Sequence, residues 1–200
     1  MGDHKFIRLE VADGVARLVL ARPPLNILNI EMMEELNSAL ERVQALPEVR
    51  ALVIAAEGKA FSAGVAVEDH LGDRVKPMLE AFHRIFHLLR ALPCPTVAAV
   101  QGAALGGGSE LATFCDFVIA SETATFGQPE IKVGVFPPIA AVHYPNRIGL
   151  ARTLQLLLTG EVIGAKEAER IGLVDRVASV AQLPAAVEEV LVKLSDKSRA

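Results

Sequence analysis

A glycine-rich turn places Glu110 where backbone N–H groups and a carboxylate could act on one ligand. The run Ala-Leu-Gly-Gly-Gly-Ser-Glu-Leu covers residues 104–111. If a helix begins near Ser109, its first N–H groups lack partners within the helix and point back at the turn. Fixed donors of this kind stabilise charge on a carbonyl oxygen, and glycines allow close approach to the main chain. The run alone fits this oxyanion site and a simple packing turn equally well.

A second carboxylate, Glu130, follows twenty residues later in Phe-Gly-Gln-Pro-Glu-Ile. A strand predicted at 117–120 separates the two glutamates and gives the chain room to return. A carboxyl group in an apolar setting has a raised pKa, and two carboxyls in different surroundings can divide the roles of base and acid. Apolar neighbours, Pro129, Ile131 and Val133, favour a shared site over two unrelated surface glutamates.

Other site chemistries lack their sequence patterns. The glycines are not followed by the lysine of a phosphate loop, the GxGxxG spacing is not met, and Ser109 does not lie in GxSxG. His83 and His87 lie four residues apart on one helical face, but HExxH and a third ligand are absent. We therefore interpret the two histidines as a partly exposed helix face and expect no metal. His70 is a plausible pocket residue.

Strands and helices alternate along the chain and predict an α/β fold with a mainly parallel sheet. Asp13-Gly14 predicts a hairpin, and Asn29 is a candidate helix cap. Ligands in such folds bind at loops that follow strands, where the 57–64 loop and the 102–108 turn both lie. The expected strands are 6–11, 15–20, 49–55, 96–100, 117–120 and 173–177; the expected helices are 29–46, 77–92, one from 109, two within 140–158 broken at Gly149, 165–171, and one from 184.

Length and composition fit one domain over residues 1–200, since the chain has 200 residues of which 52% are hydrophobic. The net charge of −4 gives no electrostatic basis for binding nucleic acid or an anionic membrane. The two cysteines, Cys94 and Cys115, form no CxxC pair, which favours a reducing, cytoplasmic location. No apolar run reaches the roughly 20 residues that cross a bilayer, and no secretory signal precedes the first strand.

Four motifs in order resemble the crotonase (enoyl-CoA hydratase/isomerase) family from about Phe6 to the end. They are Arg22-Pro-Pro-Leu-Asn26, Ala60-Phe-Ser-Ala-Gly64, Gln101-Gly-Ala-Ala-Leu-Gly-Gly-Gly-Ser-Glu110 and Thr125-Phe-Gly-Gln-Pro-Glu130. The resemblance implies a spiral of ββα units, assembled into homotrimers or hexamers where the C-terminal region is present. Family members usually continue into further C-terminal helices, so this part is expected to be shortened or missing in a chain that stops at Ala200.

The resemblance also assigns roles to residues of the site. The backbone N–H groups of Val65 and Gly107 are expected to form an oxyanion hole for a thioester carbonyl. Glu110 is expected to activate water and Glu130 to exchange the proton at the α-carbon. Leu25, Ala63 and Ala66 match loop positions that contact coenzyme A, which is part of the substrate, so that no separate cofactor is expected.

The implied activity is reversible hydration of a conjugated enoyl-CoA or cyclic dienoyl-CoA thioester. Relatives that only shift a double bond commonly keep one glutamate, so the pair favours hydration over isomerisation. Other enzymes with this oxyanion hole and a non-catalytic acyl-CoA-binding subunit are the alternatives. The runs 24–28 and 135–138 look most like cyclohexa-1,5-diene-1-carbonyl-CoA hydratases of anaerobic aromatic degradation.

The chain departs from the family pattern at three places. Ala66 stands where members often have Asp, and Ser109 replaces a frequent Cys. The run Phe136-Pro-Pro-Ile139 replaces a glycine-rich stretch, which is expected to reshape the wall of the acyl pocket.

Overall fold

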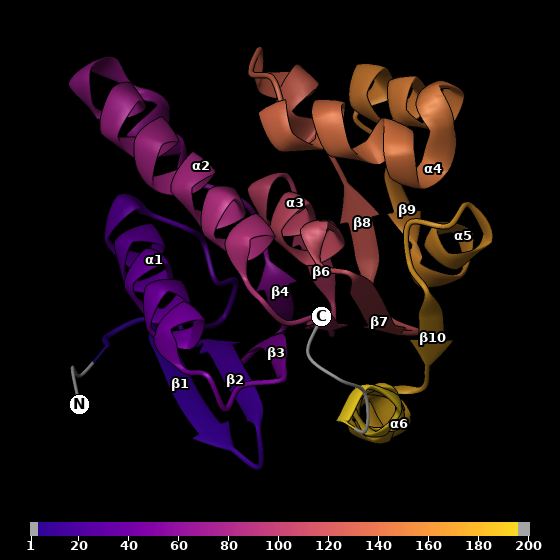
Figure 1. The fold of residues 1–200 in the computed structure, drawn as a ribbon. Helices are drawn as coiled ribbons and strands as arrows, with labels where there is room; N and C mark the ends of the chain where they lie inside the picture. Colours follow the sequence, from indigo (N-terminus) through magenta and orange to yellow (C-terminus); the bar gives the residue numbers. More distant parts are fainter. Residues whose placement is uncertain (1–3, 196–200) are drawn as a thin grey trace.

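The computed structural model describes residues 4–195 and contains two β-sheets covered by helices (Figure 1). One sheet has six strands in the order β1-β2-β3-β5-β7-β10, and the other has four in the order β4-β6-β8-β9. The strands are β1 (Ile7–Ala12), β2 (Val15–Leu20), β3 (Ala51–Ala56), β4 (Ala60–Ser62), β5 (Thr96–Val100), β6 (Ala103–Leu105), β7 (Phe117–Ser121), β8 (Thr125–Gly127), β9 (Val162–Gly164) and β10 (Arg176–Ala178).

Six α-helices and four short 3₁₀ helices connect these strands. The α-helices are α1 (Ile30–Ala45), α2 (Val75–Ala91), α3 (Gly107–Phe114), α4 (Pro138–Thr159), α5 (Ala165–Arg170) and α6 (Leu183–Ser195). The 3₁₀ helices are η1 (Val67–His70), η2 (Gly72–Arg74), η3 (Pro129–Val133) and η4 (Val180–Gln182). No helix in the described part of the chain is both long enough and apolar enough to span a membrane.

The central part of the chain is a spiral of three ββα turns, β3-β4-α2, β5-β6-α3 and β7-β8-α4. In each turn the first strand joins the six-stranded sheet and the second joins the four-stranded sheet, with parallel pairing between successive turns. The fold is therefore the crotonase-type arrangement that the motifs implied. The mainly parallel sheet that the alternation of elements predicted is the six-stranded one, in which only β1 and β2 pair antiparallel. The second strands of the turns form a separate sheet, which was not predicted.

The regions predicted as loop and turn contain short strands that the sequence analysis missed. Residues 57–64 include β4 and residues 102–108 include β6, while β8 and β9 were not predicted at all. Each of these strands has three residues, which is too short to show a period. They form because neighbouring turns of the spiral supply pairing partners.

Local signals were reliable at the N-terminal end. β1 and β2 pair antiparallel through the Asp13-Gly14 turn, as predicted. Asn29 caps α1, since its side chain accepts a hydrogen bond of 3.1 Å from the N–H of Met32. α1 and α2 lie side by side over the main core (Figure 1).

The central strands of the six-stranded sheet, β3, β5 and β7, are largely buried, which explains their nearly continuous apolar sequences. On one face Leu52 and Ile54 of β3 join the main core beneath α1 and α2. On the other face Val53 packs in a smaller cluster with Val187 and Leu191 of α6. Successive residues of a strand point to opposite faces, so α6 and the helices of the spiral enclose the sheet between them.

Two later elements differ in detail from expectation. α4 is bent at Gly149, whose φ of 76° is non-helical, and this confirms the two predicted short helices. The last strand was predicted at 173–177 but is formed by Arg176–Ala178. Leu173 and Val174 are buried in the core from a turn, so their apolar character reflects packing and not strand pairing.

Candidate active site

Glu110 lies in the first turn of α3 and is almost fully buried, with 2% of its surface exposed. One carboxylate oxygen, Oε1, accepts hydrogen bonds from the backbone N–H groups of Ile139 at 2.9 Å and Ala140 at 2.7 Å. These groups belong to the first turn of α4, where N–H donors have no partner within the helix. The start of α4 therefore fixes the Glu110 carboxyl and leaves its second oxygen for other partners.

Burial raises the pKa of Glu110 to about 8, and the nearby charge of Glu130 adds to the increase. The two N–H bonds from α4 act in the opposite direction, because they stabilise the ionised form. Burial also raises the pKa of Glu130, which lies half-buried in η3. The predicted pair of carboxyls with perturbed pKa values is therefore present, and electrostatic coupling places the two groups in one site.

Gly106 brings the glycine turn against Glu130. Its backbone has a φ of 52°, and an added Cβ would lie 2.6 Å from Oε1 of Glu130. The residue thus needs glycine for its conformation and for the approach of the carboxylate. Its N–H donates to the carbonyl of Gly127 at 2.9 Å, so the turn and the segment leading to Glu130 are also joined by backbone.

The two segments expected to supply the oxyanion hole are in contact. A Cβ added to Gly107 would lie 2.7 Å from Cγ2 of Val65, and one added to Gly64 would lie 3.9 Å from the Gly107 nitrogen. Within residues 4–195 neither the N–H of Val65 nor that of Gly107 donates a backbone hydrogen bond. The two segments that carry these N–H groups thus lie in contact near the two carboxyls, and two N–H donors without backbone partners are what an oxyanion site requires.

The three positions matched to coenzyme A contacts lie on two adjacent segments, 25–28 and 63–66. The N–H of Ala63 donates to the carbonyl of Leu25 at 2.9 Å, and the N–H of Ala66 donates to the carbonyl of Leu28 at 2.9 Å. Leu25 is 43% exposed, whereas Ala66 is buried. Leu25 is thus available to a ligand at the surface, and Ala66 leaves no carboxylate where many relatives have one.

A buried polar cluster behind the glutamates was missed in the sequence. The hydroxyl of Tyr144 lies 2.9 Å from Oγ of Ser109 and 2.8 Å from the side-chain amide of Gln128, and all three residues are buried. Gln128 belongs to the Thr125–Glu130 motif, so its position was signalled although its role was not. Tyr144 lies outside every motif, and only the fold brings it to the site.

The histidines have no cluster of metal-ligand side chains around them in the part of the chain that the structure describes. No group of three His, Cys, Asp or Glu residues within the described range could hold a metal ion. Burial lowers the pKa of His83, with a further contribution from His87. Nδ1 of His70 lies 2.9 Å from the carbonyl oxygen of Ala66, which places this ring beside the Val65 segment.

The comparison with known families decides what this geometry belongs to. Residues 10–200 match the family model described as enoyl-CoA hydratase/isomerase. The chain belongs to this family. Its relatives are named enoyl-CoA hydratases, so it is a member of a family of hydro-lyases that act on acyl-CoA thioesters.

Several enoyl-CoA hydratases are similar to this chain in sequence or in fold. It is 40% identical over 195 residues to the probable enoyl-CoA hydratase echA8 of Mycobacterium leprae, covering 94% of this chain and 76% of the relative. It is 40% identical over 168 residues to cyclohexa-1,5-dienecarbonyl-CoA hydratase of Thauera aromatica, covering 84% of this chain and 65% of the relative. The crystal structure of enoyl-CoA hydratase from Bacillus anthracis superimposes with a TM-score of 0.92 and 29% identity over 98% of this chain and 78% of that chain.

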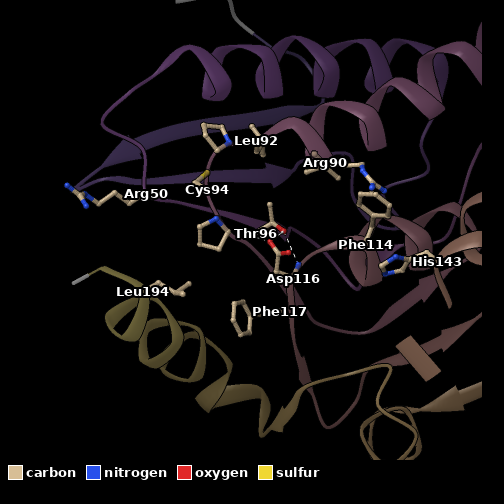
Figure 2. A pocket seen from close by; sticks show the side chains of 13 residues that line it. Arg50, Arg90, Leu92, Cys94, Thr96, Phe114, Asp116, Phe117, His143 and Leu194 are labelled. Atoms are coloured by element: carbon tan, nitrogen blue, oxygen red, sulfur yellow. Dashed lines mark hydrogen bonds between the residues drawn. The ribbon is translucent and has the colours of Figure 1, made fainter. Parts of the chain in front are cut away.

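A second region of this enoyl-CoA hydratase family member has an open cavity but different chemistry. A cavity of about 770 Å³ lies where β5 and β7 begin, and none of the site residues above lines it (Figure 2). Asp116 and Thr96 line its floor, and Oδ2 of Asp116 accepts hydrogen bonds from the N–H and Oγ1 of Thr96 at 2.7 and 2.8 Å. Its carboxylate is bonded by Thr96, and neither Glu110 nor Glu130 lines the cavity, so it is not the candidate active site.

Proposed function

We propose that the protein adds water reversibly across the conjugated double bond of an enoyl-CoA thioester. The observation that carries the proposal is the burial of Glu110 and Glu130 beside two backbone N–H groups that lack backbone acceptors. The family supports an acyl-CoA substrate, and the geometry supports a reaction in which charge develops on the thioester oxygen.

In this proposal the N–H groups of Val65 and Gly107 hold the thioester carbonyl oxygen. Addition of hydroxide to the β-carbon moves the electrons of the double bond toward that oxygen and forms an enolate. Donors that are fixed before the reaction stabilise the new charge without reorganising, and one such donor can contribute about 3 kcal/mol. Gly107 and Val65 supply the donors from the backbone, so their side chains serve only to set the position.

The two carboxyls move the protons of one water molecule. Glu110 in its ionised form removes a proton from water while the water oxygen bonds to the β-carbon. Glu130 in its protonated form gives its proton to the α-carbon as the enolate collapses. One proton leaves water and another reaches carbon, so the net change is the addition of one water molecule, and the pair retains one proton throughout.

For the acyl group we propose a conjugated cyclic diene as the finer specificity. The support is the 40% identity to cyclohexa-1,5-dienecarbonyl-CoA hydratase of Thauera aromatica and the Pro137-Pro138-Ile139 run beside Glu110. A rigid wall at the start of α4 suits a flat ring better than a flexible chain. Comparison of kcat/KM for crotonyl-CoA and cyclohexa-1,5-diene-1-carbonyl-CoA tests this choice, and a preference for crotonyl-CoA would contradict it.

Replacement of each glutamate by glutamine tests the proposed function. We expect Glu110→Gln and Glu130→Gln each to lower kcat for hydration by about 10²- to 10⁴-fold, because each removes one proton-transfer group. Glu122→Gln, at an exposed glutamate, is the matched control and should keep the wild-type rate. Unchanged hydration in both site variants would refute the proposal.

Analysis of the products in ¹⁸O-labelled water separates hydration from the other activities. Hydration places solvent oxygen in a new hydroxyl on the acyl chain, whereas isomerisation moves the double bond without gaining oxygen. A thioester hydrolase would place the label in a carboxylate. Binding of the thioester without any product would favour the non-catalytic alternative.

A further inference from the structure

The hydroxyl of Tyr144 is completely enclosed although the proposed reaction does not use it. Tyr144 is 1% exposed and lies in the first half of α4, before the bend at Gly149. Its hydroxyl contacts Ser109 of α3 at 2.9 Å and Gln128 at 2.8 Å. Burial raises the pKa of Tyr144 to about 12, so the hydroxyl stays neutral and acts only through hydrogen bonds.

The amide of Gln128 can satisfy both of its neighbours in one orientation. With its nitrogen toward Glu130, the amide donates to the two carboxylate oxygens at 3.2 and 3.3 Å, and its oxygen accepts from the Tyr144 hydroxyl at 2.8 Å. When Glu130 is ionised, the opposite orientation would turn the amide oxygen toward the carboxylate, and two acceptors would face each other. The hydrogen bonds therefore run in one direction, from Ser109 to Tyr144, then Gln128, then Glu130.

We infer that Tyr144 is a positioning residue. Its hydroxyl holds the side-chain amide of Gln128 with the nitrogen toward Glu130, and the amide in turn orients the carboxyl of Glu130. The inference rests on the proposed function for its effect on turnover, but the hydrogen bonds themselves do not depend on it. Ser109 gives Tyr144 a hydroxyl donor where relatives often have cysteine, whose S–H is a weaker donor. The serine at position 109, which replaces a frequent cysteine, thus has a hydrogen-bond partner in the hydroxyl of Tyr144.

The same series of hydrogen bonds connects the elements that carry the two carboxyls. Ser109 precedes Glu110 on α3, and Gln128 precedes η3, which carries Glu130. Helix α4 contacts both sides of the site, because its first turn binds Glu110 and its Tyr144 bonds Gln128. A change at Tyr144 should consequently alter Glu130 without removing any atom from the proposed reaction.

Tyr144→Phe in the full chain tests the inference by two independent readouts. The first is the titration of Glu130, followed by NMR in protein labelled with ¹³C at the glutamate carboxyls and assigned with Glu130→Gln. Without the tyrosine hydroxyl the amide is free to turn, its donors are lost to the carboxylate, and the pKa of Glu130 should rise by about half a unit or more. Glu110, on the facing helix α3, is the neighbouring titrating group and is followed in the same spectra.

The second readout is turnover. We expect kcat for hydration to fall by about 10- to 100-fold with KM changed less than about threefold, since the misplaced group acts in the chemical step. Thr153→Val is the matched control, because it removes a buried hydroxyl that bonds the carbonyl of Gly149 on the same helix. This control should lower thermal stability and leave both the Glu130 titration and kcat unchanged.

The two readouts distinguish failure of the inference from failure of the proposed function. An unshifted Glu130 titration in Tyr144→Phe overturns the inference, whatever the activity. A shifted titration in a protein that hydrates no enoyl-CoA leaves the positioning role intact and refutes the function. If Tyr144→Phe does not fold, Gln128→Met and Ser109→Ala take its place, with the larger shift expected for Gln128→Met because it removes the donors to Glu130 directly.

Discussion

The two ends of helix α3 hold two carboxylates in opposite situations, one buried and one exposed. At the N-terminal end Glu110 is enclosed by apolar surroundings, and its pKa is raised to about 8. Beyond the C-terminal end Asp116 faces a cavity of about 770 Å³, but its oxygen is bound by both donors of Thr96 (Figure 2). The carboxylate at the open cavity thus has its hydrogen-bond donors in place, and the enclosed carboxylate is the one whose ionised form is destabilised.

This contrast teaches that unsatisfied electrostatics locate the chemistry better than open volume does. A carboxyl that is costly to ionise can exchange protons near neutral pH. The Asp116 clamp instead joins the start of β5 to the residue that precedes β7, since Thr96 Oγ1 also accepts from the N–H of Asp116 at 2.9 Å. One end of α3 carries the carboxyl of the proposed reaction, and the other holds two strands together.

After the glutamate variants above, the largest effect is expected from filling the glycine turn. Gly107→Ala would bring a Cβ within 2.7 Å of Val65 and 3.0 Å of the Phe82 ring, so the two proposed oxyanion donors must move apart. We expect kcat/KM to fall by about 10²- to 10³-fold, as for the loss of one donor. Gly164→Ala, where an added Cβ meets no atom within 4 Å, is the control and should keep full activity. Equal activity in both variants would show that the turn is only a packing feature.

Replacing Glu110 and Asp116 by the corresponding amides should change the free energy of unfolding in opposite directions. Because the folded pKa of Glu110 is raised, its contribution to stability is intact at low pH and is lost as the pH rises toward about 8. Glu110→Gln should therefore raise the free energy of unfolding at pH 8 by a few kcal/mol, and by much less at pH 5. Asp116→Asn should lower it by about 1 kcal/mol, because it weakens the bonds from Thr96. Urea denaturation at both pH values measures the differences; destabilisation by Glu110→Gln at pH 8 would contradict the prediction.

Proton exchange by Glu110 and Glu130 should make kcat/KM for hydration depend on pH in a bell-shaped way. The proposed reaction needs one proton on the pair of Glu110 and Glu130. Above about pH 8 the pair loses this proton, and kcat/KM should fall about tenfold per pH unit. Below the raised pKa of Glu130 the pair holds two protons and water loses its base. Rates measured from pH 5 to 10 check both limbs, and a rate that stays constant up to pH 10 would exclude Glu110 as a titrating group of the reaction.

The smallest effect is expected at the cavity end. Arg90→Glu reverses a charge on the exposed wall of the Figure 2 cavity, away from the glutamates. Both kcat and KM for hydration should stay within about twofold, and the free energy of unfolding within about 0.5 kcal/mol. A tenfold change in KM would assign a substrate contact to this region.

Features that depend on neighbouring residues could be predicted from the sequence. The Asp13-Gly14 hairpin and the Asn29 cap follow from residues within three positions of each other, and both are confirmed. Gly149 likewise predicted the interruption of α4. The glycine turn and the two glutamates could be identified because each lies in a short motif.

Features that depend on contacts between distant segments could not be predicted. β4 and β6 have three residues each and are strands because β6 pairs with both β4 and β8. Tyr144 reaches Ser109, 35 residues earlier, and nothing in the run around it indicates a polar role. The donors that fix Glu110 are backbone N–H groups of Ile139 and Ala140, and the types of these two residues do not reveal them. Such groups are visible only once the spiral has brought the turns together.

The ββα spiral has a consequence for the order in which the site is completed during synthesis. Each turn contributes a different part: Val65 follows β4, Gly107 and Glu110 follow β6, and Glu130 follows β8. The N–H groups that hold Glu110 come last, at the start of α4. A ribosome-bound chain that ends before residue 139 would carry both oxyanion donors and both carboxyls but no anchor for the proposed base. Catalytic competence should therefore arise in one late step of translation and not in proportion to the length of chain produced.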